Sequence, residues 1–325
     1  MQRLLGGSVG LVADGPASIG RVGSAAAADD NGGMARSRRR RTPTTPYAPV
    51  PPLPLPPGRT VSLAGRGEVL VRDTGGNGPP VLLVHGWMFP SDLNWLQSYT
   101  PLSRAGYRVL AMDLRGHGRG LRTADPFRLQ DCADDAAALI YGLGLPSALV
   151  VGYSMGGPVT QLLAQRHPEK VAGFVLCATA MDWRDAKQRA FWRTMGGLRA
   201  AMGLFPVGFW RTMVRASGGS SQESSWVTSE LSRGSARDLA EAGRELSRFD
   251  SSGWAGDLSQ PGAVVLTGRD RLVPPRKQRA LADALGVTPH MVDADHDACA
   301  RSAPAFNRVL LEALADVRRT SARTA

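Results

Sequence analysis

The chain has 325 residues, 43% of them hydrophobic, and a formal net charge of +11 at pH 7. This length allows a sizeable core, in one large α/β domain with an insertion or in two small domains. The positive charge is nearly all arginine spread along the chain, which argues against a specific nucleic-acid-binding protein. The three cysteines are far apart and lack metal-ligand spacing, so we expect free thiols in a reducing compartment.

The first 57 residues differ in composition from the rest of the chain. They contain the small, polar run SAAAADDNGG, an arginine run at 35–41 and the proline-rich stretch PYAPVPPLPLPPG. Such a segment buries too little apolar surface to offset the entropy lost on ordering. We therefore predict that residues 1–57 are disordered, with a stiff polyproline II stretch before the folded domain. Met34, just ahead of the arginines, is an alternative start of the chain.

Two apolar runs have the length of a targeting or membrane segment. LLGGSVGLVA, near the start, is rich in glycine and is soon followed by Asp14, unlike the apolar core of a signal peptide. The longest uncharged run, 136–158, is broken by Gly142, Gly144 and Pro146, so it predicts a helix end, a turn and a strand. We therefore expect a cytoplasmic protein without a transmembrane segment.

From Gly58 onward, runs typical of strands alternate with runs typical of helices. The expected strands are EVLVRDTG, PPVLLVHGW, YRVLAMDLRGHG, ALVVGYS, AGFVLCA, GAVVLTGRD and PHMVDADHD, and helices are expected at DCADDAAALIYGL and MGGPVTQLLAQRH. This alternation predicts an α/β fold over 58–180 and 261–325, with a mostly parallel sheet covered by helices on both faces. Residues 181–260 are amphipathic, without a strand run, and predict a helical cap over the carboxyl ends of the strands.

The stretch GYSMGG places Ser154 between a strand run and a helix run. It matches G-x-S-x-G, a sharp turn whose glycines let the backbone fold tightly and lift the hydroxyl clear of the sheet. A serine hydroxyl is a weak nucleophile unless a base removes its proton and a third group orients that base. An acid and then a base are therefore expected further along the chain.

The expected base is His296, because it lies in the loop that follows the last strand run, downstream of the serine. The expected acid is Asp270, which ends the strand run GAVVLTGRD, and Asp182 is the alternative. Two backbone amides should form an oxyanion hole. These are the amide of Met155, directly after the serine, and that of Trp87, in the turn VHGWM after a strand.

The motifs HGW, DLRGHG, GYSMGG, GRDRLVPP and DADHDAC occur in the order typical of the α/β-hydrolase superfamily. From about Gly58 to its end the chain resembles that superfamily, including uncharacterised actinobacterial members with a similar histidine loop. The resemblance implies an α/β-hydrolase fold, with the site residues in the roles given above. In one departure, Asp295 precedes His296, where many members have glycine. Haloalkane dehalogenases and epoxide hydrolases of this fold carry aspartate in place of Ser154.

These features predict a serine hydrolase that cleaves a carboxylic ester through an acyl-enzyme. Aromatic residues and methionines of the predicted cap would line an apolar pocket for a fairly hydrophobic ester, or would only pack its helices together. A carbon–carbon bond hydrolase, an acyltransferase or a cofactor-free perhydrolase with the same triad is the alternative, followed by a non-catalytic ligand-binding protein. The sequence has no metal-ligand cluster, phosphate loop or dinucleotide motif, so we expect no cofactor.

Overall fold

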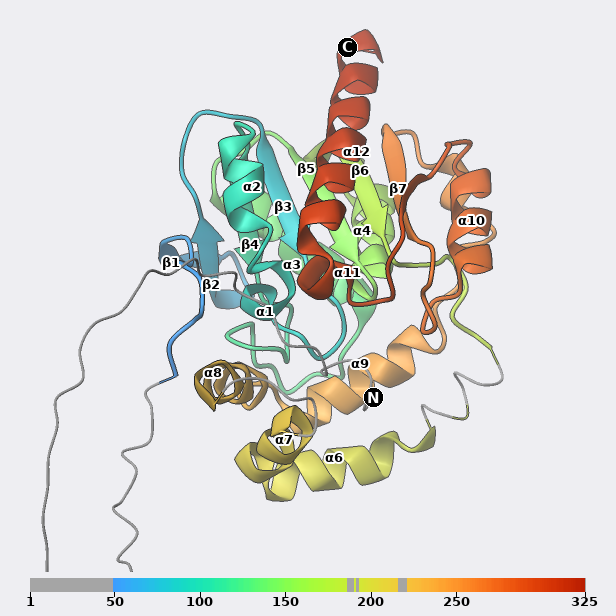
Figure 1. The fold of residues 1–325 in the computed structure, drawn as a ribbon. Coiled ribbons are helices and arrows are strands. Elements are labelled where there is room, and N and C mark those ends of the chain that lie inside the picture. Colours follow the sequence, from blue (N-terminus) through green and yellow to red (C-terminus); the bar gives the residue numbers. More distant parts are fainter. Residues whose placement is uncertain (1–48, 186–189, 191–192, 216–220, 325) are drawn as a thin grey trace, which may run out of the picture.

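A computed structural model describes residues 49–185, 190, 193–215 and 221–324 (Figure 1). Within these residues the predicted α/β class is confirmed by one eight-stranded sheet with the order β1-β2-β4-β3-β5-β6-β7-β8. Strands β1, β2 and β4 pair antiparallel, and the other pairs are parallel. The strands are β1 (Gly58–Leu63), β2 (Gly67–Asp73), β3 (Pro80–Val84), β4 (Arg108–Met112), β5 (Ala148–Tyr153), β6 (Val171–Cys177), β7 (Gly262–Thr267) and β8 (His290–Val292).

Helices cover both faces of the sheet. One face packs on α3 (Leu129–Gly142), α4 (Gly156–Arg166) and α10 (Pro275–Ala284), and the other on α1 (Ser91–Trp95), α2 (Tyr99–Arg104) and α12 (Ala303–Thr324). Short elements are α11 (Ala298–Arg301), η1 (Pro168–Lys170) and η2 (Ala255–Asp257). No helix among the described residues is both long and apolar enough to cross a membrane.

Central strand β5 shows why these residues form a doubly covered sheet. Leu149, Val151 and Tyr153 point into the core beneath α12, and Ala148 and Val150 point into the core beneath α3 and α4. Successive side chains of a strand face opposite sides, so an unbroken apolar run is buried on both. The strand ends one residue before Ser154 and therefore delivers that serine to the carboxyl edge of the sheet.

The sequence patterns missed the outermost strand, β1. Its residues alternate polar and apolar, and only Val61 and Leu63 are buried. Such a half-exposed edge strand lacks the continuous apolar run of a central strand.

Of the segment predicted to be disordered, residues 1–48 lie outside the described residues. Residues 49–57 form no helix or strand. The carbonyl of Pro56 accepts a hydrogen bond from the guanidinium of Arg72, and that of Pro57 accepts one from the amide of Asp73. The end of the proline-rich stretch is therefore attached to β2.

Among the described residues, four α-helices lie between β6 and β7, and we call them the helical insertion. They are α6 (Met195–Leu204), α7 (Pro206–Arg215), α8 (Ser221–Leu231) and α9 (Ala236–Leu246). Within the described part of the predicted cap, the only strand-like pairing is an isolated bridge between Asp182 and Asp250. Figure 1 shows α9 next to the sheet domain and α6 and α7 on the side away from it.

The insertion rests on the loop that follows β4. The amide of Ser235 donates to the carbonyl of Gly116 at 2.8 Å. Gly116 has a φ of +75°, and a Cβ atom there would lie 2.2 Å from the Cβ of Asp238. Only glycine permits both this backbone conformation and the close approach of α9.

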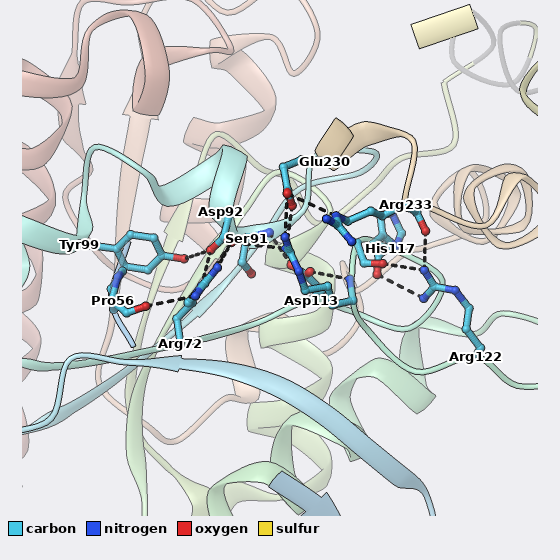
Figure 2. Close-up of polar contacts among 12 residues, drawn as sticks. Pro56, Arg72, Ser91, Asp92, Tyr99, Asp113, His117, Arg122, Glu230 and Arg233 are labelled. Atoms are coloured by element: carbon cyan, nitrogen blue, oxygen red, sulfur yellow. Dashed lines mark hydrogen bonds and ion pairs between the residues drawn. The ribbon is translucent and has the colours of Figure 1, made fainter. Parts of the chain in front are cut away.

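Ion pairs in a partly buried polar network also join the insertion to the sheet domain (Figure 2). The guanidinium of Arg119 donates to both carboxylate oxygens of the buried Glu230 on α8, at 2.6 and 2.7 Å. It also lies 3.4 Å from Asp92, which Arg72 holds from the other side. Close by, Asp113 accepts the amides of Ser91 and Arg119. Burial raises the pKa of Asp113, and the two amide hydrogen bonds oppose that shift.

Candidate active site

Ser154 occupies a strained turn between β5 and α4. Its φ is +52°, in the left-handed region that non-glycine residues rarely adopt. Its amide donates to the carbonyl of Cys177 on β6 at 2.9 Å, and its carbonyl accepts the hydroxyl of Thr179 at 2.7 Å. These contacts hold the strained residue against the neighbouring strand.

The glycines of GYSMGG lie where neighbouring atoms leave no room for a side chain. A Cβ atom on Gly152 would lie 2.3 Å from the carbonyl oxygen of Gly156, and one on Gly156 would lie 2.3 Å from that of Val84. A Cβ on Gly157 would lie 2.2 Å from the hydroxyl of Thr179. Side chains at these positions would push the turn away from β3 and β6, so the tight turn requires the glycines.

The structure brings Ser154, His296 and Asp270 together, although they lie far apart in the sequence. His296 Nε2 is 2.9 Å from Ser154 Oγ, and His296 Nδ1 is 2.8 Å from Asp270 Oδ2. Both distances are those of hydrogen bonds. The three residues come from the carboxyl ends of β5, β7 and β8, as the strand patterns predicted.

Asp270 is buried and is surrounded by hydrogen-bond donors. Its Oδ1 accepts the backbone amides of Leu272 and Val273 at 2.9 and 2.8 Å. Its Oδ2 accepts the hydroxyl of Thr267 at 2.8 Å and the side-chain amide of Gln278 at 3.1 Å, in addition to facing His296. These donors stabilise an ionised carboxylate and fix its orientation.

Asp295, the departure from the family pattern, takes part in the histidine loop. Its Oδ1 accepts the amide of His296 at 2.8 Å and that of Arg271 at 3.1 Å. From the other side, the hydroxyl of Tyr153 donates to the carbonyl of His296 at 2.6 Å. The position before the histidine therefore needs no glycine in this chain.

One expected oxyanion donor adjoins the serine in the chain, and the other follows a glycine that packs against the serine. Met155 directly follows Ser154 and precedes the first residue of α4. Trp87 follows Gly86, where a Cβ atom would lie only 3.3 Å from the Cβ of Ser154. The amide of Gly86 donates to the side chain of Asn94 at 3.0 Å, which fixes the turn beside the serine.

The other histidines hold structural positions. His85 accepts the amide of Leu114 at 2.9 Å, and burial lowers its pKa to about 4. Burial also lowers the pKa of His117 to about 3. His167 follows α4 and contacts Asp134 at 2.8 Å. His290 begins β8 and lies 3.1 Å from Asp316. Each of these four histidines has a structural contact of its own.

The remaining candidates for an acid, a nucleophile or a metal ligand do not take part in the contacts among Ser154, His296 and Asp270. Asp182, the alternative acid, pairs with Arg184 at 2.9 Å. The three cysteines are buried and unbonded to one another, and burial raises the pKa of each thiol, that of Cys299 to about 12. Such thiols stay protonated and unreactive at neutral pH. Among the described residues no group of three or more His, Cys, Asp and Glu side chains is arranged to hold a metal ion.

Sequence patterns missed the residues that support the site. Tyr153 lies inside the elbow motif, but its partner His296 is 143 positions away. Thr267 and Gln278 face Asp270 from the end of β7 and from α10. The sequence shows that some of these polar residues lie at strand ends. It does not show which distant residue each of them contacts in the folded chain.

Known proteins resemble this chain in sequence and in structure. The α/β-hydrolase fold family model matches residues 79–207. Epoxide hydrolase B of Mycobacterium tuberculosis is 38% identical over 101 residues, which are 30% of this chain and 28% of that protein. A bifunctional esterase/perhydrolase of Acinetobacter calcoaceticus is 36% identical over 111 residues, 34% of this chain and 40% of that protein. The chain thus matches less than half the length of either relative.

The structural likeness extends over most of the described chain. The enol-lactonase of Burkholderia xenovorans LB400 aligns with a TM-score of 0.63 and 24% identity, covering 79% of this chain and 100% of the other. At that identity the likeness shows the fold alone. This likeness agrees with the family match, with the eight-stranded sheet and with the position of Ser154 at the carboxyl edge of the sheet. The chain has the α/β-hydrolase fold, and its residues 79–207 match the family model of that fold.

Proposed function

We propose that the protein is a serine hydrolase that cleaves carboxylic esters through an acyl-enzyme on Ser154. The observation that carries the proposal is the continuous hydrogen-bond chain from Asp270 through His296 to the serine hydroxyl. A neutral imidazole protonated at Nδ1 donates to Asp270 and accepts the serine proton at Nε2. This arrangement supplies the base that a serine needs to become a nucleophile.

The reaction would proceed in two halves. Ser154 Oγ attacks the ester carbonyl carbon while His296 Nε2 takes the serine proton, and the carbonyl π electrons move onto the oxygen. The tetrahedral intermediate collapses, the alcohol leaves with the proton from the imidazolium, and the acyl group stays on the serine. Water then attacks the acyl-enzyme by the same proton path and releases the acid. Asp270 stays ionised and stabilises the imidazolium.

The amides of Met155 and Trp87 would bind the oxyanion of each intermediate. Met155 supports this role because its amide lies at the start of α4, where the helix dipole favours negative charge. Trp87 supports it because the turn that carries it lies against Ser154. The indole Nε1 of Trp87 donates to the carbonyl of Leu239 on α9 at 2.7 Å, which fixes this turn against the insertion.

The helical insertion would act as the cap over the site and favour a fairly hydrophobic ester. Its helices form an apolar cluster with the turn that carries Trp87. The buried members of this cluster are Met88, Met202, Trp210, Val214, Leu231 and Leu239. Partly buried apolar side chains border it: Trp87, Phe89, Leu93, Leu198 and Phe209. The buried members pack the helices of the insertion together, which is the alternative role given to the cap residues above. The partly exposed members support an apolar surface that would contact the substrate.

The test is hydrolysis of p-nitrophenyl esters of increasing acyl length by wild type, Ser154→Ala and a control, Ser103→Ala, which changes an exposed serine on α2. We expect a maximum at a medium or long acyl chain, loss of turnover in Ser154→Ala, and wild-type rates in Ser103→Ala. Turnover that survives in a folded Ser154→Ala would overturn the proposal. A preference for the shortest ester would overturn the hydrophobic-substrate part alone.

A second candidate is perhydrolysis with the same three residues. It is favoured by the similarity to a bifunctional esterase/perhydrolase. Hydrogen peroxide would replace water as the nucleophile that attacks the acyl-enzyme, giving a peracid and the regenerated serine. Peracid formation from a carboxylic acid and hydrogen peroxide, measured with wild type and Ser154→Ala, separates this reaction from hydrolysis.

A further inference from the structure

The corner between α6 and α7 exposes three apolar side chains in four residues. Leu204 and Phe205 are each 72% exposed and Val207 is 46% exposed. On α6 the side opposite Leu204 is buried through Met195 and Met202, and on α7 Trp210 and Val214 are buried further along the helix, beyond the exposed first turn that carries Val207. The corner between these helices is therefore exposed to solvent, on the side of the insertion away from the sheet (Figure 1).

The same part of the chain is strongly basic. Residues 186–222 contain no Asp or Glu and have six basic residues: Lys187, Arg189, Arg193, Arg199, Arg211 and Arg215. The four arginines within the described residues are all exposed, and none lies within 4 Å of a described carboxylate, although the charge of Arg199 helps to lower the pKa of Glu241. Other exposed arginines, such as Arg308 with Glu312, do form ion pairs.

This combination distinguishes the corner from the other exposed apolar side chains. Tyr141 on α3, Leu272 in the loop after β7 and Met291 on β8 are exposed singly, and Val50 and Leu53 lie in the proline-rich stretch, outside any helix or strand. Contiguous exposed apolar residues mark interaction sites, whereas scattered ones are normal. Neither a second copy of this corner nor the arginine run at 35–41 complements its positive charge. The positive charge of this segment complements an anionic surface. The exposed apolar side chains leave water only if that surface also has an apolar layer that they can enter.

We propose that this corner docks the protein on an anionic phospholipid bilayer. Leu204, Phe205 and Val207 enter the boundary between headgroups and acyl chains, and the surrounding arginines lie at the level of the phosphates. Apolar insertion and attraction to anionic lipids together are what bind amphipathic surface helices to membranes. The proposal does not depend on the reaction at Ser154.

The first experiment measures binding of the full chain to vesicles of phosphatidylglycerol and phosphatidylcholine, and of phosphatidylcholine alone, by co-sedimentation. The test variant is Leu204→Ser with Phe205→Ser and Val207→Ser. The matched control changes three exposed apolar residues elsewhere: Leu53→Ser, Tyr141→Ser and Met291→Ser. Both variants keep the N-terminal arginines, so any binding by that segment is common to both. Thermal unfolding checks that each variant is folded.

We expect wild type and control to bind the anionic vesicles, and the test variant to bind at least about tenfold more weakly. Equal binding by test variant and wild type would overturn the proposal, since the corner would then contribute nothing. Equal binding to neutral and anionic vesicles would overturn the part assigned to charge. Self-association of the wild type without lipid, lost in the test variant, would assign the corner to a second copy instead.

A second experiment locates the contact. Because Cys132, Cys177 and Cys299 are buried, a cysteine introduced by Phe205→Cys can be labelled selectively with a polarity-sensitive fluorophore. We expect a blue shift on adding anionic vesicles, and no shift for the same label at Met291→Cys. A label at position 205 that stays in water while the protein is bound would contradict the proposal.

Discussion

The carboxyl edge of the sheet and the helical insertion differ in how their residues are held. At the sheet edge, Asp270 alone accepts two backbone amides and two side-chain donors besides facing His296. The insertion is attached by contacts spread over several elements, among them the ion pair of Arg119 with Glu230, hydrogen bonds from loops of the sheet domain to α8 and α9, and an apolar cluster around Met88. The difference indicates that the sheet domain fixes the geometry of Ser154, His296 and Asp270, and that the insertion contacts the proposed site through the turn that carries Trp87.

The largest expected effect follows from Asp270→Asn. The side-chain amide would present an N–H group to the donors around Asp270 and would no longer favour the Nδ1-protonated imidazole. We expect kcat/KM for a p-nitrophenyl ester to fall about 10³-fold or more. Asp293→Asn, which changes an exposed aspartate that follows β8 and pairs with Arg269, should leave it unchanged. A loss below tenfold in Asp270→Asn would show that the sheet-edge contacts do not control the reaction.

The attachment of the insertion is tested by Glu230→Gln. Glu230 is buried, so removing its charge leaves Arg119 without its main partner, and we expect unfolding free energy to fall by about 3 kcal/mol. Glu312→Gln breaks an exposed pair with Arg308 and should cost less than about 1 kcal/mol. Denaturant unfolding measures both. Similar losses in the two variants would mean that the network of Figure 2 does not hold the insertion.

A pH-dependent effect is expected at the boundary between the two regions, at His117. Its pKa is lowered to about 3 by burial, so below about pH 6.5 the unfolded chain binds a proton that the folded chain does not. This histidine therefore lowers stability as pH falls from about 6.5 towards 3, by about 2 kcal/mol at pH 5. His117→Phe should remove that part of the slope. Unchanged slopes of unfolding free energy against pH would contradict this.

The smallest effect is expected from Tyr153→Phe. The ring would keep its packing against Trp95 and Phe306, but the hydrogen bond to the carbonyl of His296 would be lost. One neutral hydrogen bond corresponds to about 1 kcal/mol, so we expect kcat to fall about fivefold with KM unchanged. A rise in KM instead would assign Tyr153 to substrate binding. No change would show that Asp295 suffices to hold the loop.

The sequence predicted the sheet domain well, because its signals are local. The apolar strand runs identified the central strands, and a serine between glycines at a strand end identified the elbow at Ser154. His296 and Asp270 were expected from their positions after strands, which parallel pairing brings to one edge. Edge strand β1 was missed because it is half exposed.

The contacts that support and surround the site were not predictable in this way. The bonds from Tyr153 to His296 and from Gln278 to Asp270 depend on the packing of distant elements. The same holds for the pairing of Arg119 with Glu230, 111 residues apart. A charged residue in an amphipathic run gives no sign of whether it faces solvent or a buried partner.

The central claim is that the contacts at the sheet edge make Ser154 a nucleophile. The most direct measurement is intact-protein mass spectrometry after treatment with a fluorophosphonate, with peptide mapping, for wild type and His296→Ala. We expect one adduct per chain, on Ser154, in the wild type, and far slower labelling of a folded His296→Ala. A folded wild type that gains no adduct, or gains it on another residue, would contradict the account.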